Sequence, residues 1–208
     1  MRKVISVIIN LLRMIKNRIN QKRLKNSNFS IVASNCNGGI ISHDLNQQFN
    51  SPFVNLWIRP KDYIKLLSDF DNYMDTDLTF TKETGINYPV GLLRDIKIYF
   101  QHYKSEGEAK EKWNKRRKRV NKSNLFILFT DRDGCTYHEL ELFDKLPFKN
   151  KVVFTRQEYP RIKSSFYIKG FEKEQEVGIC SSYKSKYSLN RYLDDFDYVS
   201  WFNENNTI

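Results

Sequence analysis

The loop Asn35-Cys36-Asn37-Gly38-Gly39 brings a thiol, two side-chain amides and two glycines together directly after an apolar run. A cysteine at the start of a helix has a lowered pKa and can act as a nucleophile when a histidine takes its proton. Side-chain amides and exposed backbone N–H groups can hold an oxyanion, a sugar or a phosphate. We therefore predict that Cys36 is catalytic. The predicted substrate ligands of this loop are Asn35, Asn37, Gly38 and Gly39.

The base for this thiol is expected from one of two histidines. His43 stands seven residues after Cys36 on the same predicted helix face. His102 follows the predicted strand at residues 96–100 and can reach the loop from a second strand end. We predict His102 as the catalytic partner. The alternative is that Cys36 is a buried small hydrophobe in a glycine turn, which is a common role of an isolated cysteine.

A second polar loop, Asp131-Arg132-Asp133-Gly134, follows the apolar run LFILF. Two carboxylates one residue apart can hold a Mg²⁺ or Mn²⁺ ion that in turn binds the diphosphate of a substrate. We predict Asp131 and Asp133 as metal ligands and catalytic residues. Arg132 and the more distant Lys115 would help to neutralise the diphosphate. The alternative is that Asp133 and Gly134 form the turn while Asp131 pairs with Arg132 or caps a backbone amide.

The rest of the chain alternates short apolar runs with amphipathic segments that carry helix start signals. Pro60 begins one predicted helix, and the capping boxes Ser105/Glu108 and Thr136/Glu139 begin two others, with a further helix over residues 189–203. The predicted strands are residues 29–33, 89–93, 96–100, 125–130, 151–155, 165–168 and 177–180. These elements predict one α/β domain with a mostly parallel sheet flanked by helices. Sites in such folds gather at the carboxyl ends of strands, so both polar loops should face one cleft.

Composition limits the chain to a small set of protein classes. The 208 residues are 40% hydrophobic and 14% aromatic, which is enough for one sizeable core and argues against disorder. The three cysteines stand far apart, so no disulfide framework is expected and a reducing, cytoplasmic compartment is indicated. The net charge of +11 lies mostly in residues 1–28, which contain eight Lys or Arg residues and no acid. A nucleic-acid partner is therefore not expected.

This basic segment predicts an amphipathic helix with one broad apolar arc. The apolar positions are Val4, Ile5, Val7, Ile8, Ile9, Leu11, Leu12, Met14, Ile15 and Ile19, and the polar ones are Arg2, Lys3, Ser6, Asn10, Arg13 and Asn17. The apolar run is too short to span a bilayer, and no signal-peptide cleavage site follows it. We predict that residues 1–25 bind an anionic membrane surface, and that residues 1–26 form a leader before an α/β domain of residues 27–208. The alternative is a helix that packs on the core or on a second subunit.

Several segments of the chain resemble a bacterial family commonly described as exopolysaccharide biosynthesis proteins, whose members otherwise carry a domain of unknown function. The resemblance rests, in order, on FSIVASNCNGG, SPFVNLWI, the long block YPVGLLRDIKIYFQHYKSEGEAKEKWNKRRKRVNKSNLFILFTDRDGC and FDKLPFKNKVVFT. It covers residues 28–200, and the basic leader lies outside it. It implies a role in capsule or exopolysaccharide assembly without an established reaction.

A second resemblance, to a papain-like cysteine peptidase family, rests on shorter motifs. Asn35-Cys36, the segment at residues 51–53, His102 and the basic helix segment at residues 112–117 follow the order of that family. At residues 54–55 the chain has Val-Asn where the family has Asp-Trp. This resemblance implies Cys36 as nucleophile and His102 as base, with Asp131 or Asp133 orienting the histidine.

Together these features predict a transferase of bacterial surface-polysaccharide assembly, peripheral on the cytoplasmic face of the cell membrane. Its substrates would be a sugar nucleotide or a lipid-linked saccharide, and it would transfer a sugar or a phosphosugar. Two alternatives remain open. One is a thiol acyltransferase or hydrolase that uses Cys36 and His102, and the other is a non-catalytic basic protein that binds lipid or nucleic acid.

Overall fold

Four parallel strands form the central sheet of the protein in the order β1-β5-β6-β7. The computed structural model describes the backbone of residues 2–204 and the side chains of residues 8–204. The sheet strands are β1 (Ser30–Ala33), β5 (Leu125–Thr130), β6 (Asn150–Thr155) and β7 (Ser165–Tyr167). β1, β5 and β6 are mostly buried, as is typical of strands that are covered on both faces, whereas β7 at the edge of the sheet is half-buried. The predicted α/β fold with a mostly parallel sheet is therefore confirmed.

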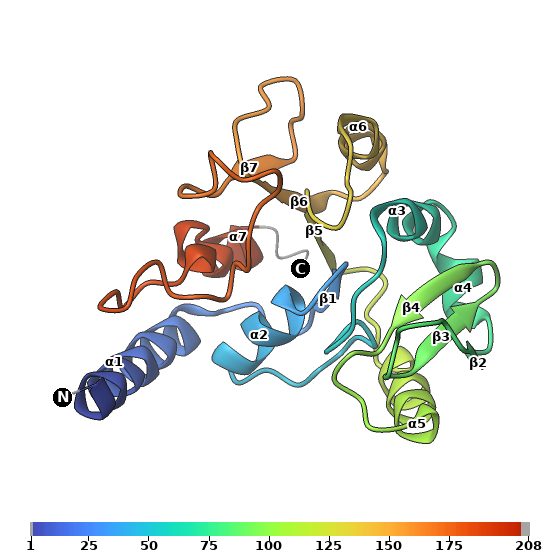
Figure 1. Ribbon diagram of the computed structural model, residues 1–208, viewed down its shortest axis with the longest axis horizontal. Coiled ribbons are helices and arrows are strands. Elements are labelled where there is room, and N and C mark those ends of the chain that lie inside the picture. The colour runs from blue at the N-terminus through green and yellow to red at the C-terminus, as the bar shows by residue number, and fades with distance from the viewer. Residues whose placement is uncertain (1, 205–208) are drawn as a thin grey trace.

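Helices cover both faces of this sheet (Figure 1). Side chains alternate along a strand, so Phe126 and Leu128 of β5 face one core while Ile127 and Phe129 face the other. The first core is closed by α2 (Asn37–Asp44), η1 (Tyr192–Asp195) and α7 (Tyr198–Glu204), and the second by α3 (Pro60–Ser68) and α6 (Tyr137–Lys145).

A small antiparallel sheet packs beside the second core. Its strands are β2 (Thr79–Thr81), β3 (Val90–Leu93) and β4 (Ile96–Tyr99), and α4 (Phe70–Asp75) and α5 (Glu106–Arg117) contribute to the same core. Arg94 takes a positive φ of 55° in the short connection between β3 and β4. Trp57 extends the sheet by a backbone bridge, in which its N–H donates to the carbonyl oxygen of Tyr99 at 2.9 Å.

The predicted helix starts agree with the structure. Pro60 stands in the first turn of α3, and Thr136 and Glu139 form both hydrogen bonds of a capping box at α6. Ser105 Oγ accepts a hydrogen bond from the Glu108 N–H at 3.2 Å and so caps α5. Each cap pairs backbone groups that the first helical turn leaves unpaired.

Two predicted elements differ from the structure. Residues 177–180 form no strand, because the Val177 N–H donates to Asp131 while the Val177 side chain enters the core from a loop. The helix predicted over residues 189–203 is divided into η1 and α7 by Phe196, whose backbone is extended. The helix expected to begin at Cys36 is α2, although two glycines in its first turn disfavour a helix by propensity. Two short elements, α4 and β2, were not predicted.

The predicted N-terminal helix is α1 (Arg2–Arg23). Its predicted positions at residues 2–7 lie outside the described side chains, so the apolar arc can be traced only from Ile8 onward. Within the described residues, no helix combines the length and apolar character that crossing a bilayer requires.

Candidate functional site

The loop between β1 and α2 is tied to the end of the neighbouring strand β5. Asn35 Nδ2 donates to Thr130 Oγ1 at 3.0 Å, and Asn35 Oδ1 accepts from the Asn37 N–H at 3.2 Å. Cys36 stands at the N-cap position of α2. Because β1 and β5 are adjacent and parallel, their carboxyl ends bring this loop beside the loop that follows β5.

Gly38 and Gly39 serve close packing of α2. A Cβ on Gly38 would lie 2.9 Å from side-chain atoms of Ala33 and Ile31, and one on Gly39 would lie 3.2 Å from Val54 Cγ1. The lack of a side chain at Gly38 therefore lets α2 approach β1, and the lack of one at Gly39 lets it approach Val54. Neither glycine lines the large pocket described below, although both were predicted as substrate ligands.

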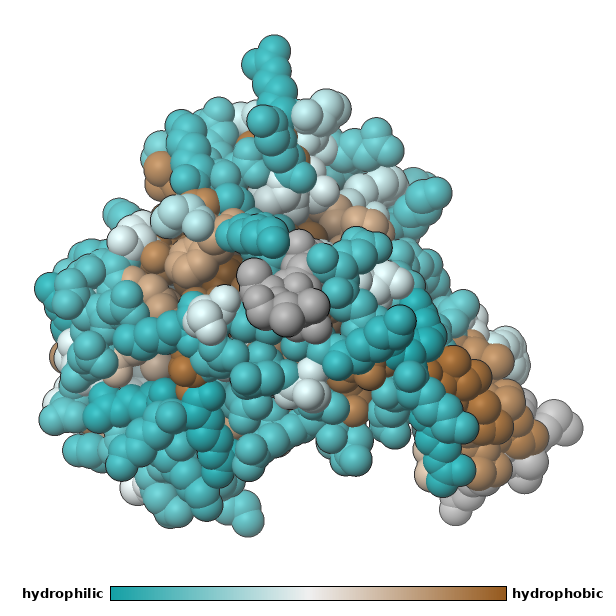
Figure 2. Space-filling view, turned by 180° about the vertical axis from the view of Figure 1, so that it is seen from behind, coloured by the Kyte–Doolittle hydropathy of each residue, from teal (hydrophilic) through white to brown (hydrophobic). Residues whose placement is uncertain are grey.

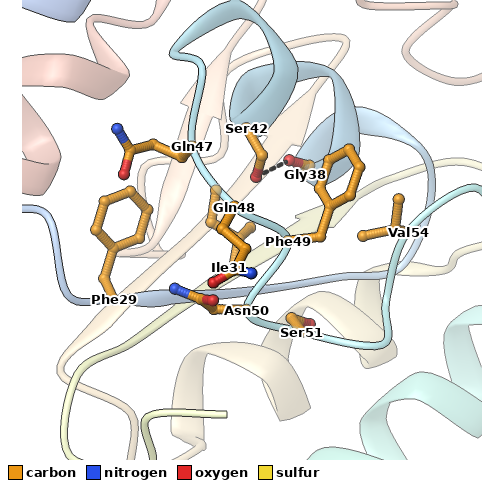
Figure 3. A pocket seen from close by; sticks show the side chains of 10 residues that line it. All are labelled: Phe29, Ile31, Gly38, Ser42, Gln47, Gln48, Phe49, Asn50, Ser51 and Val54. Carbon is orange, nitrogen blue, oxygen red and sulfur yellow. Dashed lines mark hydrogen bonds between the residues drawn. The ribbon is translucent and has the colours of Figure 1, made fainter. Parts of the chain in front are cut away.

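A small cavity lies beneath α2, between Phe29, Phe49 and Val54 (Figure 3). Ser42 Oγ donates to the Gly38 carbonyl oxygen at 2.9 Å beside it. Its volume of about 10 Å³ leaves room for about one water molecule and excludes a sugar.

The two predicted loops line one larger pocket, with a volume of about 380 Å³. Pockets of this size hold small-molecule ligands. Its walls come from five segments that are distant in sequence. The lining residues are Asn35, Cys36, Asn37, Ile40, Trp57, Gln101, His102, Arg132, Asp133, Ile179, Cys180 and Ser181.

The thiol of Cys36 is half-buried in this pocket. Cys36 Sγ accepts a hydrogen bond from Gln101 Nε2 at 3.4 Å and lies 3.9 Å from the Leu56 carbonyl oxygen. Burial raises the pKa of the Cys36 thiol, and the Gln101 hydrogen bond opposes this rise only in part. The direction is opposite to the lowered pKa that the helix N-terminus predicted. His102 lines the same pocket, but no hydrogen bond joins it to Cys36 among the described contacts.

Asp131 of the second loop is buried and accepts hydrogen bonds from two other segments of the backbone. Its Oδ1 accepts from the Val177 N–H at 2.7 Å, and its Oδ2 accepts from the Arg156 N–H at 2.9 Å. Burial raises the pKa of Asp131, while the two backbone hydrogen bonds lower it. Both carboxylate oxygens are thus engaged with the backbone, and Asp131 does not line the pocket. This geometry is the backbone-capping alternative for Asp131.

Asp133 does line the pocket, at the turn of the same loop. Asp133 and Gly134 have positive φ angles of 60° and 81°, and the Asp133 N–H donates to Glu176 Oε2 at 2.7 Å. Arg132 Nε lies 3.7 Å from Glu176 Oε1. Burial raises the pKa of Asp133. In the described part of the chain, no group of three or more His, Cys, Asp or Glu side chains is placed to hold a metal ion.

Lys115, the remaining predicted ligand, lies exposed on α5 and does not line the pocket. Other basic side chains of this segment are engaged with the body of the protein. Arg116 Nη1 donates to Tyr103 Oη at 2.8 Å, and Arg117 Nη1 donates to the Thr76 carbonyl oxygen at 2.7 Å. Part of the basic run is therefore structural and is not available to a phosphate.

Four parts of the pocket were not predicted, and one of them is Ile40 of α2. Gln101 directly precedes His102, and its position after β4 was a usable signal. Trp57 and residues 179–181 have no local pattern that marks them, because tertiary packing alone brings them to the pocket.

Helix α1 is fixed to the body by its polar side. Arg13 is buried and donates from Nη2 to Asp44 Oδ2 at 2.5 Å and from Nη1 to Asp194 Oδ2 at 2.7 Å. Asn17 Nδ2 and Gln21 Nε2 donate to Asp44 Oδ1 and the Asp44 carbonyl oxygen, each at 2.9 Å. Burial alone would lower the pKa of Arg13, but the hydrogen bonds to Asp194 and Asp44 raise it. The guanidinium therefore stays charged.

The opposite side of α1 exposes apolar side chains, which gather over the helix at the lower right of Figure 2. We call this surface the α1 apolar face, and its side chains are between 39 and 55% exposed. It consists of Ile8, Leu11, Leu12, Met14, Ile15 and Ile19. Arg18 and Lys22 are exposed on the same helix and pair with no carboxylate in the described part of the chain.

Two segments join α1 to the pocket. Helix α2 contributes Asn37 to the pocket at one end and Asp44 to the Arg13 ion pair at the other. The segment after Ile179 lines the pocket and then reaches α1, where Lys16 Nζ donates to Asn190 Oδ1 at 2.9 Å. Both α1 and the pocket are thus in contact with α2 and with the segment of residues 179–190.

The sequence matches the family described as Domain of unknown function (DUF1919) over residues 7–203. The chain belongs to this family. The match begins inside α1, so most of this helix belongs to the DUF1919 region. The resemblance over residues 28–200 had left this helix out. An uncharacterized protein of Haemophilus influenzae is 50% identical over 187 residues, which are 90% of each chain. The DUF1919 description names no reaction, so the function is argued from the site itself.

Proposed function

We propose that this member of DUF1919 is a peripheral membrane transferase that adds a sugar or a phosphosugar during assembly of a bacterial surface polysaccharide. The observation that carries the proposal is the orientation of α1. Its apolar face is exposed while its polar side is fixed to the segments that line the pocket. Apolar side chains flanked by unpaired Arg and Lys suit an anionic membrane surface, where lipid-linked saccharides reside.

The pocket has groups for the transfer itself. Arg132 would neutralise the diphosphate of a sugar nucleotide, because a guanidinium binds phosphate oxygens through two parallel hydrogen bonds. His102 would take the proton of the acceptor hydroxyl. The acceptor oxygen then bonds to the sugar carbon while the bond from that carbon to the phosphate oxygen breaks, and the nucleotide leaves with the electron pair.

A shared cation on Asp131 and Asp133 does not fit this arrangement. Both oxygens of Asp131 accept backbone hydrogen bonds, and only Asp133 reaches the pocket. The proposal therefore assigns no step to the predicted Mg²⁺ or Mn²⁺ ion.

The proposal is tested in the bacterium that encodes the protein, by deleting the gene and measuring surface polysaccharide. We expect loss of polymer together with accumulation of a lipid-linked precursor, and restoration by the wild-type gene. Leu11→Gln with Ile15→Gln should fail to restore polymer, because it removes apolar contact area from a helix that still folds. The matched control is Tyr137→Gln with Leu142→Gln, two exposed apolar positions on α6. Unchanged polymer in the deletion strain contradicts the proposal.

A second candidate function is thiol-dependent acyl transfer or hydrolysis. It is favoured by the 3.4 Å contact between Gln101 Nε2 and Cys36 Sγ, and by the presence of His102 in the same pocket. In such a reaction the sulfur would bond to the acyl carbon while the bond from that carbon to its leaving group breaks. His102 would pass the thiol proton to the leaving group, and a hydroxyl or water would then take the acyl group from the sulfur. The raised pKa of the Cys36 thiol makes this candidate the weaker one.

A further inference from the structure

We propose that the pocket continues past Trp57 into a neighbouring groove, and that the two together bind a saccharide chain stacked on Trp57. The inference rests on the proposed function and names the acceptor of that reaction. An enzyme that extends a polysaccharide can position the acceptor by holding several of its sugar units beside the transfer site. The groove and its aromatic boundary supply such a binding surface.

One face of the Trp57 ring packs against the protein, which holds the ring in place. Its ring stacks on Tyr99 with centroids 4.0 Å apart and planes inclined by 9°. Its Nε1 donates to Tyr88 Oη at 3.3 Å. The side chain is half-buried and lines the pocket, so the indole surface that faces away from Tyr99 is the part left for a ligand.

A groove with a volume of about 550 Å³ begins on the other side of this aromatic boundary. Tyr88, which accepts the Trp57 hydrogen bond, lines the groove while Trp57 lines the pocket. The two walls also meet along the chain, where His102 belongs to the pocket and Lys104 to the groove. A chain ligand can therefore run from His102 across Trp57 into the groove.

The chemistry of the groove matches a saccharide. A sugar ring has an apolar C–H face, which packs on an aromatic ring, and a polar rim, which needs hydrogen-bonding groups. Thr84 and Asn87 supply an exposed hydroxyl and an exposed amide. Lys82 and Lys104 pair with no carboxylate in the described residues and supply ammonium donors.

Glu83, which lines the groove, is fixed by ion pairs and a hydrogen bond. It pairs with Lys97 at 2.9 Å and Arg59 at 3.1 Å, and the Tyr99 hydroxyl donates to it at 3.1 Å. The Lys97 hydrogen bond lowers the pKa of Glu83, so this carboxylate remains charged and bound to its partners. It thereby fixes Tyr99 beneath the Trp57 ring.

The test is isothermal calorimetry of the full chain with disaccharides and tetrasaccharides prepared from the surface polysaccharide of the encoding bacterium. Trp57→Ala should raise the Kd for the tetrasaccharide about tenfold, whereas Trp57→Phe, which retains a stacking ring, should change it less than about threefold. Lys104→Ala should weaken binding of the tetrasaccharide and leave binding of the disaccharide unchanged, since the disaccharide does not reach the groove. Tyr137→Ala on α6 is the matched control, and melting temperatures check folding.

The inference is overturned if the tetrasaccharide binds no tighter than the disaccharide, or if Lys104→Ala and Trp57→Ala leave the chain-length preference unchanged. It is also overturned if UDP binding, and not tetrasaccharide binding, depends on Trp57, because the indole would then stack on a nucleotide base. These results concern binding alone. They are therefore separable from the polymer phenotype, whose failure would remove the proposed function itself.

Discussion

Cys36 is subject to opposing influences that decide whether it can act as a nucleophile. Burial raises the pKa of its thiol, and the hydrogen bond from Gln101 stabilises the thiolate in part. Because the first effect is the larger, the thiol stays protonated at neutral pH. Burial likewise raises the pKa of Cys180, to about 12. The raised pKa therefore argues against Cys36 as a thiolate nucleophile.

The pH dependence of alkylation tests this assignment. Iodoacetamide should label Cys36 of the native protein slowly at pH 7, and faster as the pH rises above the ordinary thiol value of 9.0. Gln101→Ala should shift the profile to higher pH, because it removes the donor that stabilises the thiolate. Peptide mass spectrometry gives the rates. Rapid labelling at pH 7 that falls in the His102→Ala variant would restore the thiol mechanism.

Helix α1 shows how an amphipathic element can be attached by its polar side. The ion pairs of Arg13 with Asp44 and Asp194 are nearly inaccessible to water, with side-chain exposures of 5, 4 and 3%. Removing one partner of such a buried pair leaves an uncompensated charge and costs about 3 to 5 kcal/mol. Because these contacts hold α1 by its polar side, the α1 apolar face remains exposed to solvent.

A variant of Arg13 tests the attachment. Arg13→Ala should lower the free energy of unfolding by about 3 kcal/mol, and the exposed Arg18→Ala should change it by less than about 0.5 kcal/mol. Burial alone would raise the pKa of Asp194, but the hydrogen bond from Arg13 lowers it below the ordinary 3.8. The stabilisation of the folded state by the Arg13–Asp194 ion pair is therefore present above pH 4, and it is lost as the pH falls through the lowered pKa of Asp194. Urea unfolding gives the free energy of unfolding of wild type and Arg13→Ala, and their difference should be smaller at pH 3 than at pH 7. An equal difference at the two pH values would contradict the role of the ion pair.

Elements with strong local signals were predictable, and those set by distant partners were not. The buried runs of β5 and β6 and the caps of α5 and α6 follow from residue type and spacing alone. The segment at residues 177–180 has an apolar pattern that suits a strand, but Asp131 takes the Val177 N–H and the segment remains a loop. Helix α2 depends on the packing of Gly38 against β1, which no local pattern contains.

At the scale of the whole molecule, the topology brings together the two loops that the sequence singled out. Adjacent parallel strands β1 and β5 end side by side, so Cys36 and Arg132 line one pocket. Residue spacing predicted this meeting. It left open whether Asp131 binds a metal or caps a backbone amide, because the N–H groups that Asp131 accepts from belong to the distant residues 156 and 177.

The proposed function requires that the α1 apolar face binds a membrane surface, and vesicle binding tests this requirement most directly. The protein should sediment with vesicles that contain phosphatidylglycerol and much less with pure phosphatidylcholine, because Arg18 and Lys22 lie beside the apolar face. Leu11→Gln with Ile15→Gln should weaken binding at least tenfold, since each side chain contributes on the order of 1 kcal/mol when buried in lipid. Tyr137→Gln with Leu142→Gln should bind like wild type. Equal binding by wild type and the α1 variant, or no preference for anionic vesicles, would contradict the account.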